Sequence, residues 1–238
     1  MDRLFPVAIL AGGLATRLRP ITETIPKALV DVAGKPFIAR QLEYLHGQGV
    51  RDVVLCVGYL GEMIKGVVDA GESYGLQVRY SFDGPKLLGT GGALKKALPL
   101  LGDYFFVLYG DSYLPIDFSA VQDAYVQSSR PALMTVLKNG DRLDKSNVLF
   151  VDGKLVEYNK RAPREEMNHI DFGLAILSSS ALEDCCSDSA RFDLADVYHD
   201  LSMTGQLFGL EVHQRFYEIG SHAGLKETID YFISKDKA

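Results

Sequence analysis

The sequence predicts an α/β fold: a Rossmann-like, mostly parallel sheet flanked by helices, with a smaller α+β region in the second half of the chain. Through residues 1–138, apolar runs typical of buried strands alternate with helical patterns. Glycine-rich loops follow two of the expected strands. After residue 146 the pattern changes to a hairpin and short strands. We therefore expect one domain over residues 1–238, with an N-terminal region of residues 1–138 and a C-terminal region of residues 139–238.

The elements of the N-terminal region follow from their patterns in order. The Pro36–Gly47 stretch has one apolar face and reads as a helix, and Gly61–Ala70 reads as a second helix with Met63, Val67 and Ala70 facing inward. A third helix is expected to follow the Gly89–Gly92 cluster and to run to residue 98, and a fourth covers residues 117–128. The expected strands are Phe5–Leu10, Asp52–Val57, Leu76–Tyr80, Tyr104–Tyr109 and Ala132–Leu137.

The C-terminal region contains a strong hairpin signal. Asp152-Gly153 separates two strand-like runs, and this dipeptide suits a tight two-residue turn. A strand is expected over His169–Ile176 and a helix over residues 192–203, followed by short strands at 207–212 and 216–219. Ser221 is placed to cap a last helix that reaches Ile233.

Composition and charge exclude several classes of function. The chain of 238 residues carries a net charge of −6 and no dense basic run, which argues against a nucleic-acid partner. No signal peptide and no membrane-spanning apolar run is visible. The three cysteines lack a spaced framework, so a reducing compartment is expected. Cys56 reads as a core residue, and the orientation of Cys185 and Cys186 stays open. We expect a cytoplasmic protein without a membrane partner.

The most informative stretch is Leu10–Pro20, which follows the first buried strand. It contains two glycines and two arginines, and Pro26-Lys27 comes soon after. Because glycine lacks a Cβ, backbone N–H groups there can approach a phosphate closely, and arginine offers forked donors to the same ligand. No Gly-Lys-Ser/Thr follows, which excludes a P-loop, and the third glycine of a dinucleotide fingerprint is missing. The stretch therefore predicts a polyphosphate cradle of another kind.

Other chemical groups gather at the same edge of the predicted sheet. Both glycine loops and Asp111 follow strands, and ligands of parallel α/β sheets bind beyond the carboxyl ends of the strands. On first principles the Gly89–Gly92 loop either lets backbone approach a planar ligand or caps a helix tightly. Asp111 is suited to hold Mg²⁺ with waters and phosphate oxygens. The five histidines form no ligand spacing and are read as structural.

The loop Leu-Ala-Gly-Gly-Leu-Ala-Thr-Arg-Leu-Arg-Pro resembles the signature loop of the sugar-1-phosphate nucleotidyltransferases. One position departs from that pattern, because Ala15 stands where the family usually has glycine. The resemblance covers nearly the whole chain and is strongest before Asp111. In length and loop pattern the chain is most similar to the guanylyltransferases for heptose 1-phosphate and the uridylyltransferases for amino-sugar 1-phosphates, such as N-acetylmuramate 1-phosphate.

The resemblance assigns roles to individual residues of this chain. It implies that Lys27 contacts the nucleotide phosphates and Arg17 the leaving pyrophosphate, and that Asp111 and Glu218 hold Mg²⁺. Glu218 stands where the family usually has aspartate. The residues expected to bind the nucleotide are Leu10, Ala11, Gly12, Gly13, Thr16, Gly89, Thr90, Gly91 and Gly92.

The acceptor side of the site matches the family less closely. Where the family has Glu-Lys-Pro, this chain has Asn159-Lys160-Arg161. We expect Lys160 to bind the acceptor phosphate, with Arg161 as an alternative, and Asp171 to bond the sugar. The N-terminal region then binds the nucleotide and the C-terminal region the acceptor.

The implied activity joins a nucleoside triphosphate, with GTP slightly favoured, to a sugar 1-phosphate and releases pyrophosphate. The resulting NDP-sugar would serve cell-surface glycans, lipopolysaccharide or capsule. Two alternatives stay open: the same chemistry with CTP or UTP on a non-sugar phosphorylated acceptor, and a non-catalytic regulatory protein that binds nucleotide sugars. Arg17, Lys27 and Asp111 argue against the second. The oligomeric state, including a homo-oligomer, is not fixed by the sequence.

Overall fold

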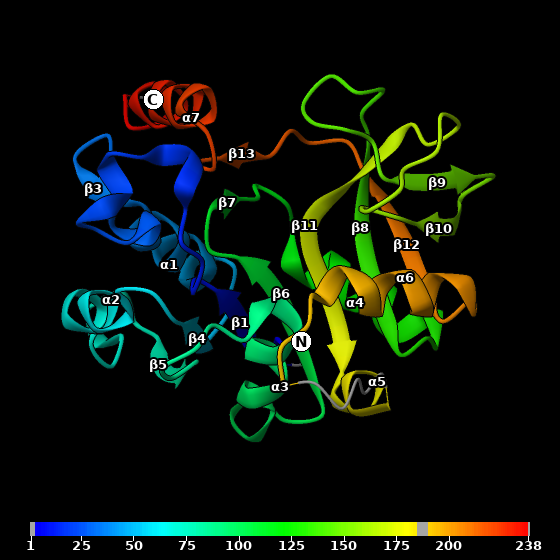
Figure 1. Ribbon diagram of the computed structural model, residues 1–238, viewed down its shortest axis with the longest axis horizontal. Coiled ribbons are helices and arrows are strands. Elements are labelled where there is room, and N and C mark those ends of the chain that lie inside the picture. The colour runs from blue at the N-terminus through cyan, green and yellow to red at the C-terminus, as the bar shows by residue number, and fades with distance from the viewer. Residues whose placement is uncertain (1–2, 185–189, 238) are drawn as a thin grey trace.

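The computed structural model describes residues 3–184 and 190–237 of the chain (Figure 1). Cys185 and Cys186 lie outside the described residues. The α-helices are α1 (Phe37–Gly47), α2 (Gly61–Val68), α3 (Gly89–Leu101), α4 (Phe118–Ser128), α5 (Ser179–Asp184), α6 (Leu194–Met203) and α7 (His222–Lys235). The strands are β1 (Val7–Leu10), β2 (Asp31–Val32), β3 (Lys35–Pro36), β4 (Asp52–Val57), β5 (Gln77–Phe82), β6 (Tyr104–Tyr109), β7 (Ser112–Tyr113), β8 (Ala132–Lys138), β9 (Val148–Val151), β10 (Lys154–Tyr158), β11 (His169–Ser178), β12 (Leu207–Val212) and β13 (Tyr217–Glu218).

A nine-stranded mixed sheet forms the centre of the molecule. Its strands follow the order β10-β9-β11-β6-β1-β4-β5, and β8 and β12 extend from β11. The strands β6, β1, β4 and β5 are all parallel, which confirms the predicted core. Strand β11 is antiparallel to both β6 and β8 and so joins the two regions of the chain into one continuous sheet. The carboxyl ends of the four parallel strands therefore meet at one edge.

Helices cover both faces of this sheet. One apolar cluster joins α1, α2 and α4 to one face, and a second joins α3, α5 and α6 to the other. Alternate residues of β1 divide between the two, since Val7 and Ile9 belong to the first cluster and Ala8 to the second. This division is the two-sided burial that the near-continuous apolar runs predict.

The inward face predicted for α2 is wrong. Met63 and Val67 are 39% and 46% exposed, whereas Ile64 and Val68 are buried. Gly61 explains the difference, because a Cβ there would lie 2.9 Å from the side chain of Val57. The first turn of α2 therefore packs against Val57 of the sheet with no room for a side chain at Gly61. This contact fixes which face of the helix is buried.

The hairpin and the last helix confirm their predictions. Asp152 and Gly153 have φ values of 49° and 73°, as a turn with two left-handed residues requires. Strands β9 and β10 pair on either side of this turn. Ser221 caps α7, and its Oγ accepts a hydrogen bond from the N–H of Gly224 at 3.0 Å.

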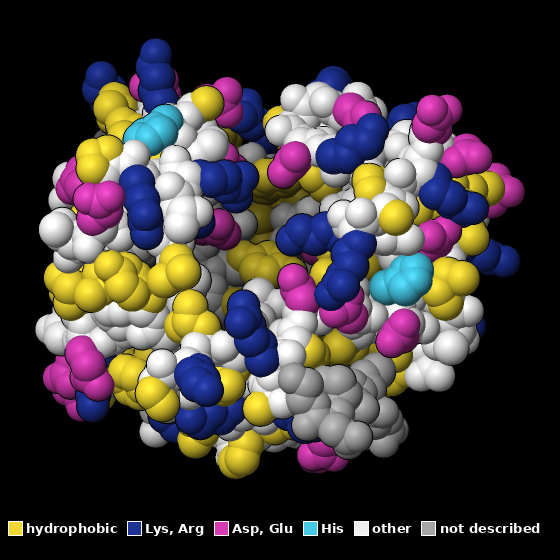
Figure 2. All heavy atoms as spheres, in the orientation of Figure 1, with side chains coloured by type: hydrophobic (Ala, Val, Ile, Leu, Met, Phe, Trp, Pro, Cys, Tyr) yellow, Lys and Arg dark blue, Asp and Glu magenta, His cyan; other side chains and the backbone are white. Residues whose placement is uncertain are grey.

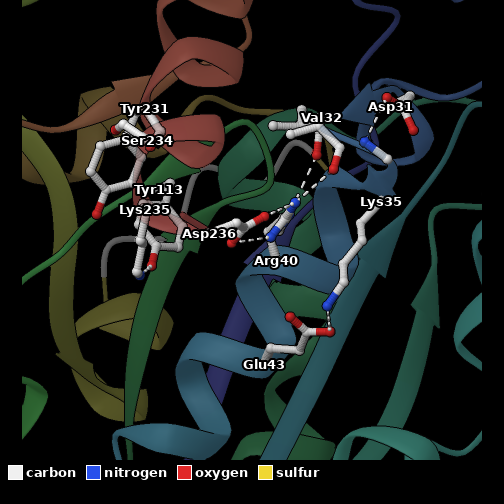
Figure 3. A network of polar contacts seen from close by, with 12 residues as sticks. Asp31, Val32, Lys35, Arg40, Glu43, Tyr113, Tyr231, Ser234, Lys235 and Asp236 are labelled. Carbon is white, nitrogen blue, oxygen red and sulfur yellow. Dashed lines mark hydrogen bonds and ion pairs between the residues drawn. The ribbon is translucent and has the colours of Figure 1, made fainter. Parts of the chain in front are cut away.

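A third, smaller core anchors α7 beside the loops that follow β1. Leu18, Val32, Phe37 and Phe232 are among its buried members. At its edge the guanidinium of Arg40 donates hydrogen bonds to the carbonyls of Val32 and Ala33 and pairs with Asp236 at 2.9 Å (Figure 3). The C-terminal helix is thus fixed against the N-terminal region of the chain.

Candidate active site

The loop after β1 crosses the carboxyl edge of the sheet at very short range. The N–H of Ala11 donates to the carbonyl of Cys56 at 2.8 Å, and a Cβ on Gly12 would lie 3.0 Å from the backbone nitrogen of Gly58. Ala15 adopts the left-handed conformation, with φ 50° and ψ 42°. The backbone therefore requires at Ala15 the conformation for which the family's usual glycine is suited.

This loop forms one wall of a cavity of about 250 Å³. The residues predicted to bind nucleotide that line it are Leu10, Ala11, Gly12, Gly13, Gly89 and Thr90, and Lys27 and Asp111 join them. Thr16, Gly91 and Gly92 are not among the lining residues. Both glycine loops thus reach one cavity, although only some residues of each loop face it.

The second glycine loop is divided between the cavity wall and a tight helix cap. Gly89 and Thr90 face the cavity, but Gly91 and Gly92 pack against a distant segment. The N–H of Gly91 donates to the carbonyl of Phe192 at 3.1 Å, and a Cβ on Gly91 would lie 2.3 Å from the ring of Phe192. Thr90 also donates to Asp193 at 2.8 Å. The tight helix cap accounts for two of the glycines without any ligand.

Charged side chains from three segments converge beside the cavity. Lys27 Nζ lies 2.8 Å from Asp111 Oδ2 in a mostly buried ion pair. Nη2 of Arg17, Oδ2 of Asp111 and Oε2 of Glu218 all lie within 3.4 Å of the point where a Cβ on Gly220 would stand. Pairing of β7 with β13 places Glu218 opposite Ser112, the neighbour of Asp111. Two cations and two carboxylates therefore share one small region (Figure 2 shows the central hollow with charged side chains at its rim).

Asp111 and Glu218 are the residues suited to a divalent cation. Both are carboxylates that face the same point, and Mg²⁺ binds to one or two protein carboxylates while water and phosphate oxygens complete its octahedron. Glu218 also accepts hydrogen bonds from the N–H of Gly220 and from Ser221 Oγ, the latter at 2.7 Å. Among the described residues, no group of three or more His, Cys, Asp or Glu could hold a metal by itself. The donors present fit Mg²⁺ only if a bound phosphate contributes ligands.

A second cavity of about 410 Å³ adjoins the first, and Asp111 lines both. Arg17, Lys160, Asp171 and Glu218 line this second cavity. It therefore brings together the predicted acceptor residues and the charged cluster. Arg161 lies elsewhere, in an exposed ion pair with Asp196 at 2.5 Å.

Asp171 lies at an irregular point of β11, where the pairing with β8 shifts. Burial raises the pKa of this carboxyl to about 6, although a hydrogen bond from the Gly173 N–H and the charge of Lys160 both act to lower it. The Asp171 N–H donates to Asn147 Oδ1 at 3.0 Å. The side chain can thus accept from, or when protonated donate to, a hydroxyl group of a ligand.

Sequence reasoning missed Asp83, Asp144 and Asn147 as lining residues. Asp83 lines the first cavity, and the other two line the second. The signal for Asp83 is its place just after β5, which ends at Phe82 rather than at Tyr80 as expected. Asp144 and Asn147 lie between strands and carry no comparable signal.

Comparison with known proteins shows the family of the chain. Residues 7–146 match the family described as nucleotidyl transferase, and the chain belongs to that family. The D-glycero-alpha-D-manno-heptose 1-phosphate guanylyltransferase of Campylobacter jejuni is 32% identical over 178 residues, which are 74% of this chain and 77% of that protein. The N-acetylmuramate alpha-1-phosphate uridylyltransferase of Neisseria meningitidis is 42% identical over 113 residues, which are 47% of this chain and 49% of that protein.

A solved structure supports the fold assignment. HddC from Yersinia pseudotuberculosis, complexed with GMP-PN, superposes with a TM-score of 0.79 at 26% identity, covering 96% of this chain and 100% of that one. The predicted family and the Rossmann-like fold are thereby confirmed. Within the residues that the structure describes, no helix has the length and apolar character needed to cross a membrane.

Proposed function

We propose that the protein transfers a nucleotidyl group from a nucleoside triphosphate to a sugar 1-phosphate. A phosphate oxygen of the acceptor forms a bond to the α-phosphorus, and the bond to pyrophosphate breaks. The observation that carries this proposal is the cluster of Arg17, Lys27, Asp111 and Glu218 at the junction of two cavities, with Asp111 lining both. A nucleotide in the first cavity and an acceptor in the second would meet there.

The main obstacle to this reaction is electrostatic. Two phosphates with two charges each, about 4 Å apart, repel by about 16 kcal/mol at an effective dielectric constant of about 20. Lys27 lines the first cavity and would offset charge on the nucleotide phosphates. Arg17 and Lys160 line the second cavity, where Lys160 would offset charge on the acceptor phosphate and Arg17 charge on the phosphates at the junction. The nucleophile is already an anion, so the site needs no general base. Positioning and charge stabilisation are the contributions of this chain.

Mg²⁺ belongs to this proposal. Asp111 and Glu218 would hold it, and when bound it would neutralise phosphate charge. Asp171 would accept a hydrogen bond from an acceptor hydroxyl in the second cavity, which gives the acceptor its orientation. Lys27, the partner of Asp111 in the ion pair, would then be free to contact phosphate.

The test is release of pyrophosphate across a grid of nucleoside triphosphates and sugar 1-phosphates, with and without Mg²⁺. We expect turnover with at least one pair, and loss of turnover in Asp111→Asn. The matched control is Asp123→Asn, which removes one exposed carboxylate on α4. Binding of nucleotide sugars without pyrophosphate release from any pair would favour the regulatory alternative. Turnover with phosphorylated compounds other than sugars would show that the acceptor is not a sugar 1-phosphate.

A further inference from the structure

The side chain of Glu218 folds back over the first turn of α7. Its Oε1 accepts a hydrogen bond from Ser221 Oγ at 2.7 Å, and its Oε2 accepts one from the N–H of Gly220. The Glu218 carbonyl accepts a further hydrogen bond from Thr228 Oγ1, on α7, at 2.8 Å. Both the backbone and the carboxylate of Glu218 are therefore held against this helix, and the space that the helix leaves open decides where the carboxylate lies.

The carboxylate has this space because residue 224 is a glycine. A Cβ on Gly224 would overlap Oε1 of Glu218, and it would stand 2.5 Å from Cδ and 2.8 Å from the carbonyl oxygen of the same residue. Gly224 is the third residue of α7 and is buried. Its φ is not positive, so the backbone does not require glycine there, and glycine inside a helix is less stable than alanine. The side chain of Glu218, which fills the place of a Cβ, accounts for this glycine.

The folded-back carboxylate faces the charged cluster at the junction of the two cavities. Glu218 Oε2 lies 2.5 Å from the point where a Cβ on Gly220 would stand. Nη2 of Arg17 and Oδ2 of Asp111 lie 3.1 and 3.4 Å from the same point. Because glutamate has one more methylene than aspartate, its carboxylate stays beside residue 220 only when the side chain bends back. Bending back requires the space that Gly224 leaves.

Resting on the proposed transferase function, we propose that Gly224 is a positioning residue, which lets the long side chain of Glu218 fold back over α7 so that its carboxylate faces Asp111. Gly224 acts only through Glu218, because it lines neither cavity. A side chain at position 224 would push the carboxylate away from Asp111 and divide the pair of oxygen donors suited to Mg²⁺. Residues 218 and 224 therefore form a matched pair: glutamate at 218 requires glycine at 224, whereas the shorter aspartate does not.

The test compares Gly224→Ala in two backgrounds, the wild-type protein and Glu218→Asp. Binding of labelled inorganic pyrophosphate is measured by equilibrium dialysis with and without Mg²⁺. In the wild-type background we expect Gly224→Ala to weaken binding with Mg²⁺ about 10- to 100-fold, as for loss of a group that orients a metal ligand, and to change binding without Mg²⁺ less. In the Glu218→Asp background the same substitution should weaken binding with Mg²⁺ by less than about threefold. The matched control is Gly66→Ala, which adds a Cβ to a helical glycine with open space around it.

A thermal scan of the same four proteins gives a readout that needs no ligand. The contact of a Cβ at position 224 with the carbonyl oxygen of residue 218 is common to both backgrounds, so the difference between the backgrounds reports the side chain alone. We expect Gly224→Ala to lower Tm by about 3 °C or more beyond its effect in Glu218→Asp, because only glutamate is overpacked. If Gly224→Ala does not fold in the wild-type background, a folded double variant supports the matched pair and an unfolded one overturns it.

Equal losses of Mg²⁺-dependent binding and of Tm in the two backgrounds would overturn the proposal, since Gly224 would then serve only the helix or the carbonyl of Glu218. Wild-type pyrophosphate binding that does not depend on Mg²⁺, or that survives Gly224→Ala unchanged, would overturn it as well. The transferase proposal fails separately, if no substrate pair releases pyrophosphate, because the exchange of residues 218 and 224 is measured without turnover.

Discussion

Replacing Lys27 with Met tests whether the charged cluster acts on the transition state. Lys27 Nζ lies 2.8 Å from Asp111 Oδ2, and the two side chains are only 19% and 29% exposed. One unit charge about 4 Å from a phosphate charge is worth about 4 kcal/mol at an effective dielectric constant of about 20. Allowing for partial solvent screening, we expect kcat to fall by about 10²- to 10³-fold, with a smaller change in KM.

The assay is steady-state pyrophosphate release with the best substrate pair from the grid. Lys154→Met is the matched control, because it removes the same charge from an exposed position at the hairpin turn. A circular dichroism spectrum and an unfolding curve establish that the Lys27 variant is folded. A kcat within about threefold of wild type would refute the reasoning. A rise in KM alone would show that Lys27 binds the ground state and the transition state equally.

Three further predictions concern stability. Ala15→Gly should raise Tm by about 1–3 °C in a thermal scan, because Ala15 holds φ at 50°; an unchanged or lower Tm would contradict this. The pKa of Asp171 is raised from 3.8 to about 6 in the folded protein, so protonation of this carboxyl stabilises the folded state. That stabilisation is lost as the pH rises from about 4 through 6. In urea unfolding, Asp171→Asn should be more stable than wild type at about pH 8, by up to about 3 kcal/mol, and little different at about pH 4; a larger gain at the lower pH would reverse the sign. Arg40→Met should lower the unfolding free energy by about 2–4 kcal/mol, since it leaves the carbonyls of Val32 and Ala33 without their donor (Figure 3); a variant as stable as wild type would rule this out.

Positions that depend on contacts between distant segments were missed or only partly predicted. The periodicity of Gly61–Ala70 identifies a helix, but the buried face depends on how closely Gly61 approaches Val57. The Gly89–Gly92 cluster is visible in the sequence, yet its division between cavity and cap depends on Phe192, which is far along the chain. In each case the neighbour that decides the packing lies on another segment of the chain, so a local sequence pattern cannot reveal it.

The candidate site depends both on local sequence features and on contacts that only the tertiary structure makes. Leu10–Gly13 and Asp111 are recognisable because a phosphate cradle is expected to use small residues and fixed charges directly after buried strands, which are local features. Lys27 is recognisable only through the Pro26-Lys27 pair and the family resemblance. Placing Glu218 beside Arg17 required the pairing of β13 with β7 and the packing of α7 on the N-terminal loops.

By itself, the sequence determined the order of the main strands and helices, the glycine loops and the groups suited to bind phosphate, because periodicity, turns and charge are short-range properties. It did not reveal the short strands β2, β3 and β7 or the helix α5. Tertiary structure alone decided which of those groups face a common cavity, that Asp83 lines it as well, and that Arg161 lies outside the second cavity in an ion pair with Asp196. The physical reason is that burial and electrostatic contact depend on distances in space, which the sheet sets when it brings remote strands together.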